Sequence, residues 1–304
     1  MYDIIIVGAG TAGLSAAIYG VRAGKRVLIL EENMYGGRIV NAAHIVNYPG
    51  IKKINGFDFA SGLYEQAIGL GAEMKTEEVL SIEDDGETKK VKTGQSSYET
   101  KTVILATGSK NKPLGLAHEL EWIGSGISYC ATCDGMFYRN KAVAVAGGGN
   151  IALEDAGYLA DYCSKVYIIC KGKAFPNMDQ QLAYLQAKPN VEILLHTKIS
   201  ELFGKDHLEG LEIEDLLSKE KKRLELSGLF VAVGEEPSNS RFSNLVELSQ
   251  EGYIIANEDG LTRSPGIYAA GDCREKKLRQ LITAASDGAN SAISACDYIN
   301  ERNA

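Results

Sequence analysis

An α/β fold with two three-layer domains is predicted by three observations. Short apolar runs typical of buried strands alternate with helical spacing along the chain, which favours parallel sheets covered by helices. The same strand–turn–helix pattern occurs twice, once near the N-terminus and again near residue 142. The chain has 304 residues, a length that favours two domains over one.

The first strand–helix–strand unit opens the chain. Residues 4–7 form an uninterrupted apolar run, which predicts a buried parallel strand. Leu14, Ala17, Ile18 and Val21 follow at helical spacing, and residues 27–30 form a second buried strand. Residues 103–106 are a further short apolar run.

The second unit repeats this order. Residues 143–146 predict the strand and residues 166–169 the next one, with a helix between them. The helix stripe consists of Ala152, Ala156, Leu159 and Ala160. Because the repeat is far longer than a solenoid period, it indicates a duplicated domain.

Four further segments complete the predicted elements. Residues 229–233 form a strand that ends at Gly234, and residues 266–272 form a strand that ends in a tight turn. Residues 280–299 are rich in small residues and predict a helix. The charged run 214–223 predicts a solvated hairpin or loop.

Composition excludes several classes of function. The chain is 45% hydrophobic and 24% charged, with a net charge of −8. A negative surface argues against nucleic acid and anionic membrane as partners. We find neither an export signal nor an apolar run long enough to span a bilayer. We therefore expect a cytoplasmic protein, in which the six cysteines are more often catalytic or metal-binding than structural.

A glycine-rich turn joins the strand and helix of the first unit. Gly8, Gly10 and Gly13 form a G-x-G-x-x-G pattern. The first glycine permits the turn, the second lets the backbone approach a pyrophosphate, and the third lets helix and strand pack closely. Glu31 ends the second strand, where an acidic residue binds a ribose hydroxyl. The unit is therefore predicted to be a Rossmann-like dinucleotide-binding domain.

The second unit carries a G-x-G-x-x-A variant of this pattern. Cys170 stands where the acidic residue is expected, and two lysines follow it. Lysines attract a ribose 2′-phosphate that a carboxylate would repel, so charge favours NADPH over NADH. A degenerate unit without a dinucleotide is the alternative. The candidate residues are Gly147, Gly149, Asn150, Lys171 and Lys173.

A C-x-x-C pair forms the predicted chemical centre. Cys130 and Cys133 can close an exchange-prone disulfide. Asp134 could carry protons to and from a thiolate. Half of a zinc site is the alternative, but Cys163 and Cys170 are expected on a helix and a strand and make poor additional ligands. We expect no metal. The remaining cysteines predict small buried or half-buried thiols.

These motifs together suggest a redox chain. Reduction of a disulfide needs two electrons, and two dinucleotide units suggest two carriers. A flavin suits the middle position, between a nicotinamide and the disulfide. Because disulfide and nicotinamide both need close contact with the flavin, we expect alternating domain orientations, with hinges near residues 107–113 and 234–237.

The sequence resembles the low-molecular-weight thioredoxin reductases, class II of the FAD-dependent pyridine nucleotide-disulfide oxidoreductases, over nearly the whole chain. The matching segments are residues 8–13, 36–37, 47–50, 106–108, 130–135, 147–152, 271–272 and 279–280. The resemblance implies an FAD-binding domain in residues 1–111 and 237–304, with an inserted pyridine-nucleotide domain in residues 112–236 that carries the disulfide.

The resemblance also implies roles for individual residues and for partners. Cys133 would lie nearer the flavin, Cys130 would attack the disulfide of thioredoxin or a thioredoxin-like protein, and Asp134 would be the acid–base residue. The chain would form a homodimer. Besides Gly8, Gly10, Gly13 and Glu31, the expected FAD contacts are Gly37, Asn47, Thr107, Gly108, Asp272, Arg279 and Gln280.

One segment departs from the family pattern. An H-R-R-x-x-x-R stretch usually binds the NADPH 2′-phosphate in this family, whereas residues 170–176 read CKGKAFP. NADPH remains the expected donor. The alternatives are a ferredoxin-dependent flavin thioredoxin reductase that does not use pyridine nucleotide, a flavin thiol oxidase, and a flavin-bound redox sensor without turnover.

Overall fold

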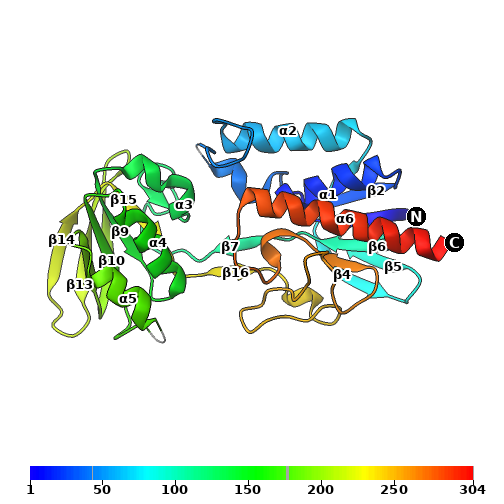
Figure 1. The fold of residues 1–304 in the computed structure, drawn as a ribbon. Helices are drawn as coiled ribbons and strands as arrows, with labels where there is room; N and C mark the ends of the chain where they lie inside the picture. The colour runs from blue at the N-terminus through cyan, green and yellow to red at the C-terminus, as the bar shows by residue number, and fades with distance from the viewer. Residues whose placement is uncertain (43, 176–177, 304) are drawn as a thin grey trace. The chain divides into compact units, whose positions relative to one another are not determined.

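The computed structural model describes the chain except for residues 43, 176–177 and 304. Pro176, the last residue of the segment that departs from the family pattern, therefore lies outside the described residues. The chain folds into two compact units (Figure 1). Unit 1 comprises Met1–Lys110 with Glu236–Ala304, and unit 2 comprises Asn111–Glu235.

Unit 1 is built on a seven-stranded sheet. Its order is β3-β2-β1-β6-β5-β4, and β17 also pairs with β6. The pairs among β1, β2, β3, β6 and β17 are parallel, whereas β4, β5 and β6 pair antiparallel. The strands are β1 (Tyr2–Val7), β2 (Val27–Glu31), β3 (Glu73–Thr76), β4 (Val79–Asp84), β5 (Lys89–Thr93), β6 (Ser97–Leu105) and β17 (Ile267–Ala269).

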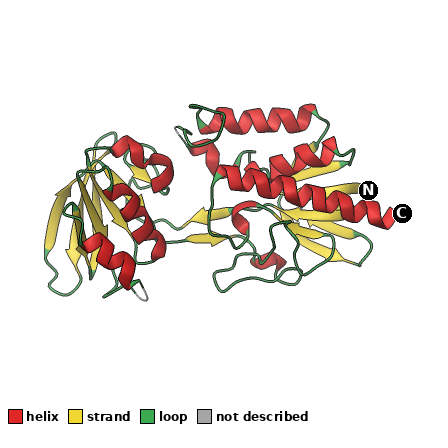
Figure 2. Ribbon diagram, in the orientation of Figure 1, coloured by secondary structure: helices red, strands yellow, loops and turns green. Residues whose placement is uncertain are grey.

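Alternating side chains of this sheet face two separate cores, as the pleat requires. Ile4 and Ile6 of β1 pack in a cluster with α1 (Thr11–Arg22), α2 (Gly56–Gly69) and α6 (Leu281–Asn303). Ile5 and Val7 pack instead with the β4–β5 hairpin and the segment that contains Phe242. Unit 1 therefore has three layers: the helices cover one face of the sheet (Figure 2), and the β4–β5 hairpin and the Phe242 segment pack against the other.

Unit 2 repeats this arrangement. Its five parallel strands have the order β11-β10-β9-β15-β8. Val143 and Val145 face a cluster formed with α4 (Asn150–Ala160) and α5 (Asp179–Gln186), whereas Ala144 and Ala146 face the antiparallel strands β12 to β14. The strands are β8 (Ile127–Ser128), β9 (Ala142–Ala146), β10 (Lys165–Ile169), β11 (Val191–Leu194), β12 (Thr197–Gly204), β13 (Leu208–Asp215), β14 (Lys221–Glu225) and β15 (Gly228–Val231).

The predicted α/β class and the duplicated Rossmann-like unit are confirmed. The charged run 214–223 lies in the exposed β13–β14 hairpin, as predicted. The expected placement of Cys163 and Cys170 was wrong, because they lie just beyond the ends of α4 and β10. The segments that join the units pair as β7 (Ser109–Asn111) and β16 (Glu235–Pro237). Among the described residues, no helix is long and apolar enough to cross a membrane.

Candidate active site

The first glycine turn has the geometry that its sequence predicts. Gly8 has a φ of +106°, and a Cβ there would collide with the carbonyl of Ala106. A Cβ at Gly13 would collide with the carbonyl of Gly8, so helix and turn touch through backbone alone. At Gly10, by contrast, a Cβ would meet nothing within 4 Å. Gly10 caps α1 without a side-chain hydrogen bond, which leaves an open helix N-terminus suited to a pyrophosphate.

Glu31 lies at the side of this turn. One oxygen of its carboxylate accepts the N–H of Ala9 at 2.7 Å and the other accepts the N–H of Asn33 at 3.0 Å. Glu31 also lines a cavity with Gly8 and Thr107. A Cβ at Gly37 would stand 3.4 Å from the Cα of Gly10. The Glu31 carboxylate thus borders a concave surface beside the first glycine of the turn.

Two distant segments meet through Asn47 and Gln280. The Asn47 Nδ2 donates to the Gln280 Oε1 at 3.1 Å, although 233 residues separate them. Arg279 stacks on the ring of Tyr253, with its guanidinium carbon 4.0 Å from the centroid. Thr107 donates to the Oδ1 of the fully buried Asn239 at 2.9 Å. Gly108 has a φ of +65° and open space where a Cβ would be. The structure thus places these expected contact residues within unit 1.

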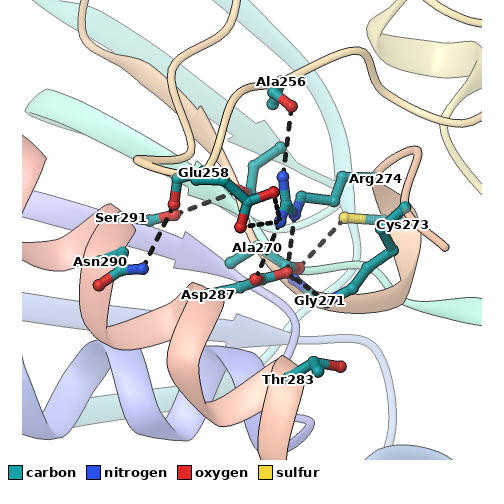
Figure 3. Close-up of polar contacts among 12 residues, drawn as sticks. Ala256, Glu258, Ala270, Gly271, Cys273, Arg274, Thr283, Asp287, Asn290 and Ser291 are labelled. Atoms are coloured by element: carbon teal, nitrogen blue, oxygen red, sulfur yellow. Dashed lines mark hydrogen bonds and ion pairs between the residues drawn. The ribbon is translucent and has the colours of Figure 1, made fainter. Parts of the chain in front are cut away.

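A buried ion cluster supports the turn that carries Asp272. Asp287 of α6 accepts the N–H of Gly271 at 2.9 Å, and Gly271 has a φ of +81°. The same carboxylate binds the Nε of Arg274 at 2.8 Å (Figure 3). It also binds the Nζ of Lys276 at 2.8 Å. The side chains of Asp287 and Arg274 are 7% and 3% exposed. Burial alone would lower the pKa of Arg274, but the carboxylates of Asp287 and Glu258 raise it.

The second glycine turn resembles the first, with Ala152 in place of its third glycine and no carboxylate beside it. A Cβ at Gly147 would collide with the carbonyl of Ala232, and Gly149 faces open space at the uncapped start of α4. Cys170 takes the place of Glu31. Its Sγ accepts the N–H of Gly172 at 3.3 Å and would lie 2.9 Å from a Cβ at Gly148. An uncharged thiol therefore replaces the carboxylate at this turn.

A cavity of about 300 Å³ adjoins the second turn. Gly147, Gly148 and Cys170 line it together with Lys171 and Lys198. Lys198 also pairs with Glu214 at 2.9 Å. Lys173 is exposed and is not among the lining residues. The side-chain amide of Asn150, another expected contact residue, bonds to Glu154 and Gln181.

Cys130 and Cys133 form a disulfide within a single helical turn, with their Cα atoms 5.3 Å apart. Cys130 precedes α3 (Ala131–Asp134), and its carbonyl accepts the N–H groups of Cys133 and Asp134. Both cysteines and Asp134 are half-buried. A Cβ at Gly135 would collide with the hydroxyl of Tyr162, which explains why glycine follows the aspartate.

The other four cysteines are fully enclosed. Cys163, Cys170, Cys273 and Cys296 are buried free thiols, as predicted. Burial raises the pKa of the Cys163 thiol to about 11 and also raises that of Cys273. Because the thiolate is the reactive form, these two buried thiols are poorly suited to disulfide exchange. Within the described part of the chain, no group of three or more histidine, cysteine or acidic side chains could hold a metal ion.

Sequence reasoning missed three supporting residues. Asp287 holds the turn at Gly271, Asn239 holds Thr107, and Ser128 donates to the Oδ2 of Asp134 at 2.7 Å. Ser128 lies two residues before Cys130, a proximity that could have drawn attention to it. Asp287 and Asn239 lie in no motif, and only the folded chain brings them to the site.

Comparisons with known proteins give one consistent result. Residues 2–288 match the family described as pyridine nucleotide-disulphide oxidoreductase. Thioredoxin reductase from Ureaplasma parvum serovar 3 is 39% identical over 304 residues, covering 100% of this chain and 98% of the relative. That of Bacillus subtilis strain 168 is 36% identical over 302 residues, covering 99% and 96%. The crystal structure of thioredoxin reductase from Streptococcus pyogenes MGAS5005 aligns with a TM-score of 0.95 and 35% identity, covering 99% of both chains.

Proposed function

Because the chain belongs to the pyridine nucleotide-disulphide oxidoreductase family, we propose that it is a thioredoxin reductase with FAD as prosthetic group and NADPH as electron donor. The observation that carries the proposal is the Cys130–Cys133 disulfide with Asp134 at its end, in a chain with two open glycine turns. The family membership makes it an oxidoreductase, and its relatives are thioredoxin reductases.

Unit 1 is the proposed FAD-binding domain. Its open turn at Gly10 suits the pyrophosphate, and Glu31 suits a ribose hydroxyl. Thr107, Gly108, Asp272, Arg279 and the Asn47–Gln280 pair are proposed to hold the rest of the cofactor. FAD, when bound, supplies a two-electron carrier between a reduced nicotinamide and a disulfide.

Unit 2 is the proposed NADPH-binding domain. The open turn at Gly149 suits a second pyrophosphate, and Lys171 lines the adjoining cavity, with the exposed Lys173 two residues further on. No carboxylate stands at position 170 to repel a 2′-phosphate. Lys171 and Lys173 take the role that arginines have in the usual family pattern.

The cysteine pair performs the proposed exchange with thioredoxin. Reduction with two electrons and two protons breaks the Cys130–Cys133 bond and leaves two thiols. Asp134 takes the proton of Cys130, and the Cys130 thiolate attacks one sulfur of the thioredoxin disulfide, which forms a mixed disulfide and releases the other sulfur of thioredoxin. Asp134 gives its proton to that departing sulfur. Cys133 then attacks Cys130 and restores the enzyme disulfide, and the proton of the Cys133 thiol passes to the second thioredoxin sulfur, so two electrons and two protons reach thioredoxin.

Thioredoxin, or a protein of similar fold, is the proposed macromolecular partner. Met136 and Phe137 follow the disulfide directly and are 47% and 44% exposed. Exposed apolar side chains next to a reactive pair favour docking of another protein. The proposed homodimer follows from the resemblance and is tested by light scattering after size-exclusion chromatography.

A stopped-flow comparison of donors tests the proposal. Oxidised enzyme is mixed anaerobically with NADPH, NADH or reduced ferredoxin, and the loss of flavin absorbance is followed. We expect NADPH to reduce the enzyme fastest, and NADPH-dependent reduction of thioredoxin to proceed over many turnovers. Reduction of the flavin by ferredoxin alone would refute NADPH as the electron donor. Peroxide formation driven by dithiol, or a single turnover with thioredoxin, would refute the thioredoxin reductase function.

A further inference from the structure

Ser128 is a buried hydroxyl beside the redox disulfide. It is the last residue of β8, where Phe230 of β15 pairs with it, and only 3% of it is exposed. The parallel sheet therefore fixes its backbone before the chain enters the cysteine turn. A buried hydroxyl needs hydrogen-bond partners, and each partner of Ser128 belongs to the reactive segment.

The hydroxyl connects Asp134 to Cys130. The Ser128 Oγ lies 2.7 Å from the Asp134 Oδ2 and accepts the N–H of Cys130 at 3.0 Å. The carbonyl of Cys130 is a second possible acceptor at 3.3 Å. A hydroxyl has one proton, and an ionised carboxylate is the stronger and here the closer acceptor. The proton of Ser128 therefore points to Asp134.

We propose that Ser128 is a positioning residue that sets the orientation of the Asp134 carboxyl group for the proton transfer to thioredoxin. This inference rests on the proposed function of Asp134 as the acid of the exchange reaction. Because the sheet fixes the backbone of Ser128, its hydroxyl holds this carboxyl group in one orientation beside the cysteine turn. The bond from the Cys130 N–H holds the attacking cysteine in register with that carboxylate.

The test uses two variants of equal shape. Ser128→Thr keeps the hydroxyl and Ser128→Val replaces it with a methyl group, and both side chains suit a strand. The pre-reduced holoenzyme is mixed with oxidised thioredoxin, and the rate of enzyme reoxidation is measured at pH 7. Bound flavin and melting temperature report whether each variant is folded.

The valine variant should lose roughly tenfold in rate at pH 7, as expected for one lost hydrogen bond to a charged group. Threonine, which keeps the hydroxyl, should restore the wild-type rate. Ser200→Ala is the matched control, since Ser200 donates to the Glu212 carboxylate at 2.9 Å in the β12–β13 pair; we expect no change in that variant.

Asp134→Asn separates this inference from the proposed function. Adding Ser128→Val to Asp134→Asn should change the rate by less than about twofold, since a residue that acts through Asp134 has no further effect once that carboxylate is gone. A valine variant with the wild-type rate, or with an undiminished effect beside Asp134→Asn, would overturn the role of Ser128 and leave the function intact. Wild-type rates in Asp134→Asn alone would refute the acid role and the inference together.

Discussion

Substitution of Cys133 should abolish the redox chemistry without disturbing the fold. Its sulfur belongs to the disulfide, and its N–H bonds only to the Cys130 carbonyl of the same turn. We predict that Cys133→Ser keeps bound FAD and lowers thioredoxin reduction by at least about 10³-fold, because the oxygen cannot restore the disulfide. Flavin absorbance and a steady-state thioredoxin assay measure the two effects.

Cys296→Ala is the control for this substitution. It removes a buried thiol of α6 that has no proposed part in exchange. It should keep both flavin and activity. Loss of flavin from the Cys133 variant would instead mean that the pair is a structural bond.

Glu31 is compared with Glu65, an exposed carboxylate of the same unit. Glu31 accepts two backbone N–H groups at the glycine turn, whereas Glu65 lies on α2 and does not line the cavity beside that turn. We predict that Glu31→Ala raises the dissociation constant of FAD by about 10- to 100-fold, the range expected for lost hydrogen bonds to a charged group. Glu65→Ala should leave it within twofold.

Titration of the apoprotein with FAD, followed by flavin fluorescence, measures both constants. Equal affinities in the two variants would contradict the ribose role of Glu31. A folded apoprotein is confirmed by circular dichroism, so weakened binding is distinguished from unfolding.

At the level of elements, the glycine turns can be predicted because the backbone groups that leave no room for a side chain belong largely to the same short motif. Gly13 touches Gly8, and Gly149 opens α4 just after Gly147. The Asn47–Gln280 contact and the Asp287 cluster could not be predicted in this way. Their partners come from separate elements, and only the packing of the folded unit brings them together.

The junction of α6 with the Gly271 turn depends on Asp287. We predict that Asp287→Asn lowers the free energy of unfolding by about 3–5 kcal/mol, because Lys276 becomes a buried cation without its carboxylate and Arg274 is left with the exposed Glu258. FAD affinity should fall as well, since the N–H of Gly271 loses its charged acceptor. Urea unfolding of the holoenzyme measures the change.

Asp297→Asn, an exposed change on the same helix, is the control and should alter stability by less than about 0.5 kcal/mol. A loss below about 1 kcal/mol in Asp287→Asn would contradict the argument. The ion cluster would then contribute no more than a pair on the surface does.

Asp155 of α4 is a half-buried carboxyl group whose ionised form is destabilised. Burial, reinforced by the neighbouring Glu154, raises the pKa of Asp155 to about 7. The folded state then binds a proton that the unfolded chain has released, so stability falls as pH rises from about 4 to 7 and is lowest above that range. Asp155→Asn should remove this loss and raise the melting temperature at pH 8 by a few degrees.

Thermal unfolding at pH 5 and pH 8 checks the sign. The difference between variant and wild type should be larger at pH 8 than at pH 5. The exposed Asp206→Asn is the control, and its difference should not depend on pH. If Asp155→Asn raised the melting temperature at pH 5 but not at pH 8, the raised pKa of Asp155 would be contradicted.

At the level of the whole molecule, the same architecture occurs twice, but the side chains beside the two glycine turns differ in charge. Both units place an uncapped helix start beside an open glycine, but a carboxylate stands at the first turn and a thiol followed by lysines at the second. The chain as a whole carries a net charge of −8. An anionic donor is therefore attracted only where local charge departs from this average.

Lys171 and Lys173 supply that local charge in the proposed donor site. We predict that replacing both with alanine raises the dissociation constant of NADPH about tenfold or more at low salt and leaves that of NADH within about twofold, because only NADPH carries the 2′-phosphate. The effect should shrink at high salt, since exposed charges are screened. The exposed pair Lys205 and Lys222, also replaced with alanine, is the matched control in the same unit. Calorimetric titration of the oxidised holoenzyme measures the dissociation constants of NADPH and NADH for both double variants. If replacing Lys171 and Lys173 weakened the binding of both nucleotides equally, these lysines would not bind the 2′-phosphate.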